Sequence, residues 1–151
     1  MNIDKLKIVS SKVVLGLLEP VALVEFAVDA LECGSDSPSL RILAGLSCDN
    51  TSEIMAYFYR ILSELGIALP EKYDAVMTLA QGIAKEILSG AIRPDDGAKR
   101  IWVLTLRCNN LQFPALDSFV YAASEWDERP EDRPVFEAGI IAAAEEVVNV
   151  P

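Results

Sequence analysis

The chain has 151 residues, a formal net charge of −10 and no histidine. Without histidine it cannot form a Ser-His-Asp or Cys-His catalytic site or a His-ligated metal site. Its 23 acidic residues against 13 basic ones give it the wrong sign for binding nucleic acid or an anionic membrane surface, since both attract cations. Hydrophobic residues make up 52% of the chain, which is typical of a globular domain and excludes intrinsic disorder.

Proline at helix starts and glycine just after helix ends divide the sequence into consecutive short helices. The first is predicted over about residues 3–16, although residues 7–18 are rich in Val and Ile and are also compatible with a strand. The second is expected over about 20–31, and the third over about 38–44, after Ser37 in the cap position. The apolar face of the second helix contains Val24, Ala27, Val28 and Leu31.

The fourth predicted helix opens with Asn50 and Glu53, which have the spacing of a capping box, and it ends at Gly66. Its inward residues are Ile54, Phe58, Ile61, Leu62 and Leu65. The fifth helix, over 71–89, has the most regular apolar face, in doublets that repeat every four residues. The doublets are formed by Ala75, Val76, Leu79, Ala80, Ile83, Ala84, Ile87 and Leu88. We expect Leu79 and Ile83, at the centre of this face, to be buried.

A sixth helix is expected after Pro94, with two aspartates in its first turn, where they stabilise the positive end of the helix dipole. Residues 101–106 are apolar nearly all round, which predicts a central helix. The seventh helix is expected over about 114–127 and the eighth over about 131–148. Their inward faces are predicted to contain Leu116, Phe119, Val120, Ala123 and Trp126, and then Phe136, Ile140, Ala143 and Val147.

These elements predict an all-α fold, a single compact array of seven or eight short antiparallel helices that forms one domain over residues 1–151. Helix should exceed about 60% of residues, well above the usual third. No apolar run reaches the roughly 18 residues that span a membrane, and no signal-peptide pattern opens the chain. Three cysteines without a CxxC pair favour a reducing compartment over a disulfide framework. We therefore expect a cytoplasmic protein.

Acidic residues are concentrated near the C-terminal end. Residues 111–151 carry nine acidic side chains against only Arg129 and Arg133, a net charge of −7. The densest stretch, 125–132, contains Trp126 and lacks the Asp/Asn and Gly spacing of an EF-hand loop. Its simplest interpretation is a solvated turn between two helices.

The alternative interpretation of this stretch is a recognition surface for a basic protein. Trp and Tyr are favoured anchors in binding interfaces, and acidic side chains speed the encounter with a cationic partner. Trp126 also continues the apolar face of the seventh helix, so its pattern fits a core position too. The candidate partner-binding residues are Tyr121, Glu125, Trp126, Asp127, Glu128, Glu131 and Asp132.

No other group of residues indicates catalysis. Asp95 and Asp96 are adjacent, so on a helix they point about 100° apart, and helix capping accounts for them better than a carboxylate pair does. Trp102 is predicted to be core, with Lys99 and Arg100 on the solvated face. No serine has a partner that marks a nucleophile, and no glycine-rich phosphate loop is present. The sequence therefore assigns no catalytic residue, cofactor or metal.

Three strings are distinctive as a set: GSDSPSL followed by LAGL within residues 34–46, GAKRIW at 97–102 and ASEWDERPEDR at 123–133. In this order they resemble a family of small, acidic, helical bacterial proteins with no established biochemistry, over about residues 20–148. The resemblance transfers no catalytic residue. In style, the chain is also similar to bacterial immunity proteins, which bind and neutralise a cognate toxin, and this likeness is an analogy.

Two functions remain. The first is a non-enzymatic protein-binding module, most concretely an immunity-type protein that neutralises a basic toxin. The second is an enzyme or small-molecule binder that uses Asp and Glu on helices. A solid core with an acidic outer face would favour the first, and a deep cleft lined by carboxylates would favour the second.

Overall fold

The computed structural model describes all residues, 1–151, and is entirely helical, with 71% helix and no strand. It contains eight α-helices and two 3₁₀ turns. The predicted all-α fold is therefore confirmed, and the strand alternative for residues 7–18 is wrong. The chain divides into two compact units, Met1–Glu71 and Lys72–Pro151, which are described separately. One domain over 1–151 stays a prediction.

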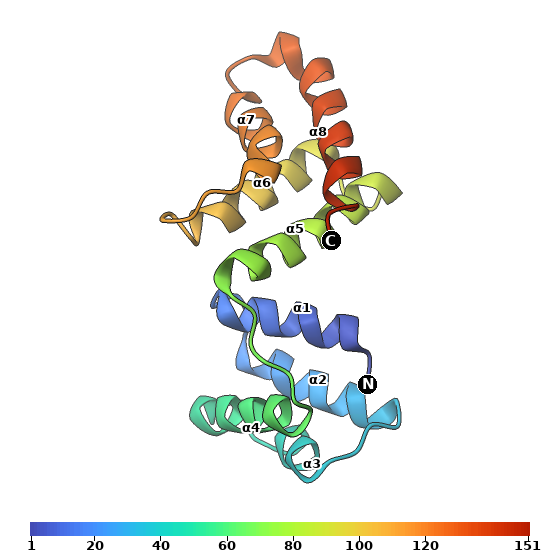
Figure 1. Cartoon of the computed structure of the whole chain (residues 1–151), viewed down its shortest axis with the longest axis vertical. Coiled ribbons are helices and arrows are strands. Elements are labelled where there is room, and N and C mark those ends of the chain that lie inside the picture. The colour runs from blue at the N-terminus through green and yellow to red at the C-terminus, as the bar shows by residue number, and fades with distance from the viewer. The chain divides into compact units, whose positions relative to one another are not determined.

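The first unit contains four helices: α1 (Ile3–Val14), α2 (Pro20–Glu32), α3 (Pro38–Ala44) and α4 (Thr51–Glu64) (Figure 1). The short helix α3 packs against both α2 and α4, which also contact each other. Asn2 caps α1. As the sequence predicts, Ser37 caps α3, and its side chain accepts a hydrogen bond from the Leu40 amide at 3.1 Å. At the start of α4, the Asn50 side chain makes no capping hydrogen bond, so the predicted capping box is wrong.

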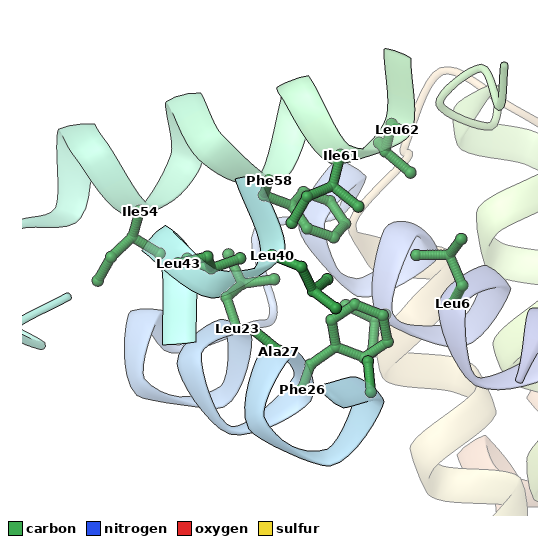
Figure 2. Packing of buried hydrophobic residues seen from close by; sticks show 12 residues of the cluster. Leu6, Leu23, Phe26, Ala27, Leu40, Leu43, Ile54, Phe58, Ile61 and Leu62 are labelled. Carbon is green, nitrogen blue, oxygen red and sulfur yellow. The ribbon is translucent and has the colours of Figure 1, made fainter. Parts of the chain in front are cut away.

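The core of the first unit gathers side chains from all four helices (Figure 2). Leu40 and Leu43 of α3 lie between the buried faces of α2 and α4, and the rings of Phe26 and Phe58 meet edge to face at 6.4 Å. The predicted inward face of α2 is partly wrong, because its buried residues are Leu23, Phe26, Ala27 and Ala30. The helix is apolar on most sides, so its sequence pattern does not single out the face that its neighbours cover. Leu65, also predicted to be inward, is exposed.

The second unit has four α-helices and two 3₁₀ turns. They are α5 (Lys72–Ser89), α6 (Pro94–Leu106), η1 (Pro114–Leu116), α7 (Asp117–Glu125), η2 (Pro130–Asp132) and α8 (Arg133–Val147). Each α-helix packs on the next, and α8 returns to pack on α5. The Gln81 side chain of α5 reinforces this closure by donating to the carbonyls of Val147 at 3.2 Å and Val150 at 2.8 Å.

Burial in the second unit confirms most of the predicted inward faces. All four predicted residues of α8 are buried, as are Leu116, Phe119, Ala123 and Trp126 around α7. On α5, Leu79 is buried but Ile83 is only half-buried and Leu88 is exposed. The prediction that α6 is a central helix is wrong, because Val103 and Leu106 are 53% and 55% exposed. The neighbouring helices cover only part of the apolar run 101–106 of α6, and Trp102 within this run is half-buried.

Gly97 of α6 packs closely against α5. A Cβ at this position would lie 2.5 Å from Cδ1 and 2.6 Å from Cγ1 of Ile87, which is itself buried. At Gly139, in α8, an added Cβ would meet no atom within 4 Å. Gly97 and Gly139 therefore have opposite packing environments.

This contrast predicts opposite effects of the same substitution. Gly97→Ala should destabilise the protein by about 1–3 kcal/mol, because Ile87 must shift within a packed interface. Gly139→Ala should stabilise it by about 0.5–1 kcal/mol, because alanine favours the helix and meets no steric obstacle. Urea denaturation measures both changes, and a stabilising Gly97→Ala would contradict the close approach of α5 and α6.

In the first unit, Phe58→Ala should lower the free energy of unfolding by about 3–5 kcal/mol, since the ring is fully buried and leaves a cavity. The matched control is Ile42→Ala on α3, where the side chain is 44% exposed and little apolar contact is lost. Thermal or urea unfolding followed by circular dichroism compares the two variants. Equal losses would show that the core is wrongly placed.

Candidate functional site

The predicted acidic stretch forms the connection between α7 and α8, and we call residues 125–132 the acidic corner. Helix α7 ends at Glu125, and the chain turns there with the Arg129 amide donating to the Glu125 carbonyl at 3.0 Å. Pro130 then opens the 3₁₀ turn η2, which leads directly into α8. The corner is thus short, and backbone hydrogen bonds from the Arg129 amide to Glu125 and from the Asp132 amide to Arg129 hold its shape.

The candidate binding residues divide by exposure. Asp127, Glu128 and Glu131 are exposed, whereas Glu125 and Asp132 are half-buried. On α7, the neighbouring Tyr121 is 55% exposed, so its ring is accessible to a partner. Trp126 is only 7% exposed and takes the core position that its sequence pattern also allowed. Of the two candidate aromatic anchors, the structure therefore leaves Tyr121 on the surface.

Arg129 holds one side of the corner together. Its guanidinium donates to the Tyr121 hydroxyl at 2.9 Å and forms an ion pair with Asp132 at 2.5 Å. It also lies 5.4 Å from the centre of the Phe136 ring, within reach of a cation–π contact. Its hydrogen bond to Asp132 raises the pKa of Arg129 above its usual value, so this side chain remains charged. Asp132 and Tyr121 are therefore fixed in position by one cation.

Arg133 stabilises the other side of the acidic corner. Its Nε donates to the Trp126 carbonyl at 3.0 Å, and its guanidinium lies 5.3 Å from the centre of the Trp126 ring. A looser ion pair joins it to Asp127 at 3.7 Å. Since both arginines pair with acids inside the corner, Glu125, Glu128 and Glu131 are left without an ion pair. The unneutralised charge of the corner is thus carried by glutamates.

Beside the corner, α7 and α8 enclose an open hollow of about 520 Å³. The two helices lie side by side and are joined by the corner at one end (Figure 1). Arg129 and Asp132 of the corner line the hollow. The remaining lining residues are Asp117, Ser118, Tyr121 and Ala122 of α7 and Val135, Phe136 and Gly139 of α8. Six of these, Asp117, Ser118, Ala122, Val135, Phe136 and Gly139, played no part in the site predicted from the sequence. The sequence did carry a signal for part of this lining. A helical spacing of three, four and seven residues places Val135, Phe136 and Gly139 on the same side as Asp132.

Two smaller hollows flank the same helices. One, of about 410 Å³, lies before α7 and includes Thr105, Asn109, Gln112 and Asp117. The other, of about 400 Å³, lies beside Trp126 and Arg133. No three Cys, Asp or Glu side chains come together in an arrangement that could hold a metal ion.

Comparison of the chain with protein-family models, curated proteins and solved structures gives no match. The family resemblance of the three sequence strings therefore stays a prediction. None of the helices combines the length and the apolar character needed to cross a membrane.

The contacts of Arg133 predict its contribution to stability. Arg133→Ala should cost about 1–2 kcal/mol, because it removes a hydrogen bond to the Trp126 carbonyl and the cation over the indole ring. Arg133→Lys should lose less, since it keeps the charge but not the planar donor group. Urea denaturation followed by tryptophan fluorescence measures both. Arg100→Ala, which removes an exposed arginine without a recorded ion pair, is the control, and an equal loss there would contradict a specific role for Arg133.

Proposed function

We propose that the chain is a non-enzymatic protein-binding module whose acidic corner docks on a basic surface of its partner. The observation that carries the proposal is the uneven neutralisation of the corner. Arg129 and Arg133 pair with Asp132 and Asp127, while the glutamates of the corner have no cation of their own. A cationic partner would relieve the repulsion among these side chains and would be steered towards them.

The exposed tyrosine beside the corner adds an anchor of the kind that binding interfaces favour. The Arg129 hydrogen bond holds the Tyr121 hydroxyl, so the ring is already ordered before a partner arrives. Ordering a side chain in advance lowers the entropy cost of binding. Charge and a rigid aromatic side chain thus occur together on one accessible surface.

In its most concrete form, the proposal is an immunity-type protein that neutralises a basic toxin. The acidic composition and single-chain helical build support this form by analogy. Such a protein would bind its toxin at a high association rate and would restore growth when the two are co-expressed.

A charge-reversal experiment tests the proposal. The double variant Glu128→Lys and Glu131→Lys changes two exposed, unpaired acids and spares Asp132, whose reversal would break the Arg129 pair. A basic protein retained by the immobilised wild-type chain at low salt should be lost from this variant. The association rate of this basic protein with the wild-type chain should fall steeply as the salt concentration rises, because exposed charges act mainly on the rate of encounter.

The matched control is Glu25→Lys with Glu32→Lys, two exposed acids of α2 that make the same change in net charge. It should retain the partner. Equal binding by the corner variant and the wild type, with circular dichroism unchanged, would remove the acidic corner from the function. A captured protein that does not harm cells when expressed alone would exclude the immunity form while leaving protein binding intact.

A further inference from the structure

Small side chains line much of the hollow between α7 and α8. Ser118 and Ala122 of α7 and Gly139 of α8 line it together with the larger Tyr121 and Phe136. The Phe136 ring is buried and meets Tyr121 edge to face at 5.9 Å. The volume of about 520 Å³ falls in the range of sites that receive a ligand group.

Large apolar side chains rim this hollow and are left in water. Val135, at the start of α8, is 70% exposed, more than any other large hydrophobic residue of the chain, and Tyr121 is 55% exposed. An apolar group placed in the hollow would cover both side chains. Burial of this kind is favourable in proportion to the area removed from water.

The charges around the hollow select the partner. Asp117 lines it without an ion pair, and the acidic corner borders it through Arg129 and Asp132. The only cation in its lining, Arg129, is already engaged by Asp132 and the Tyr121 hydroxyl. An anionic group would therefore find no free cation there, whereas a lysine or arginine would meet the unpaired carboxylate of Asp117.

We propose that this hollow receives one large apolar side chain, with lysine or arginine beside it, from a basic segment of the partner protein. This rests on the proposed function and adds to it the contact that fixes the partner in place. The acidic corner governs how fast the partner arrives, and the filled hollow governs how slowly it leaves.

A synthetic lysine-rich helical peptide with one central tryptophan serves as the probe, and a second peptide carries alanine in place of the tryptophan. Both are titrated into the full chain at low salt, while the Val135 methyl and Tyr121 ring resonances are followed by NMR. The tryptophan peptide should shift these resonances and bind at least about tenfold more tightly than the alanine peptide.

The decisive variant is Gly139→Leu, which fills the hollow from within α8, where an added Cβ meets no atom within 4 Å. It should weaken binding of the tryptophan peptide about tenfold and leave the alanine peptide unaffected. Gly82→Leu on α5 is the matched control, since its Cβ also meets no atom within 4 Å and the residue does not line the hollow. It should bind both peptides as the wild type does.

Different failures separate the two proposals. If both peptides bind equally well, and the Glu128/Glu131 reversal weakens both, the acidic docking surface stands and the hollow is overturned. If neither peptide binds at low salt, both proposals fall. Equal binding of a glutamate-rich tryptophan peptide, or of N-acetyltryptophanamide alone, would overturn the basic partner segment. A dimer of the wild-type chain that Gly139→Leu abolishes would assign the hollow to a second copy and overturn the proposal.

Discussion

Mutual burial of one apolar face on each short helix is the constraint on which both units depend. All the α-helices except the 18-residue α5 have 15 residues or fewer, and isolated helices shorter than about 12–15 residues are marginal in water. Each helix therefore persists because its neighbours cover it. In the first unit α3 is the clearest case, since Leu40 and Leu43 are fully buried between α2 and α4. In the second unit the return of α8 onto α5 provides the same mutual support.

Small residues within these helices have two opposite consequences. Gly97 lets α6 approach Ile87 so closely that no Cβ fits, whereas Gly139 and Ala122 leave a space that nothing in the chain fills. The first tightens the core and the second creates an accessible apolar surface next to unpaired acids. Small residues thus contribute both to the stability of the second unit, at Gly97, and to its proposed recognition surface, at Gly139.

The acidic corner combines order with unneutralised charge. Its two arginines neutralise the aspartates and hold Tyr121 and Trp126, so the segment keeps a defined shape despite its repulsion. Glu128 and Glu131 are exposed, Glu125 is half-buried, and none of the three forms an ion pair. This division would suit the proposed docking surface, because a disordered acidic loop would lose entropy on binding.

Much of the local structure was predictable from sequence. Pro20, Pro38 and Pro94 open helices at the predicted residues, and Gly16, Gly34, Gly66 and Gly90 adopt positive φ values just after helix ends. These outcomes depend on the covalent restrictions of proline and glycine, which act within a few residues. The inward faces of α4 and α8 were also predictable, because their apolar residues repeat with the helical period along a single stripe.

The sequence by itself thus determined the helical class, most helix boundaries and the position of the acidic stretch. Only the tertiary structure decided which face of α2 is buried, that α6 leaves Val103 and Leu106 in solvent, and that Trp126 is covered while Tyr121 is not. It also decided that Arg129 and Arg133 neutralise the aspartates of the corner, and that a hollow opens beside them. The physical reason is that caps and turns are local, whereas burial and ion pairing depend on which segments come together in space. A helix that is apolar on several sides carries no local signal for the side its neighbours will cover.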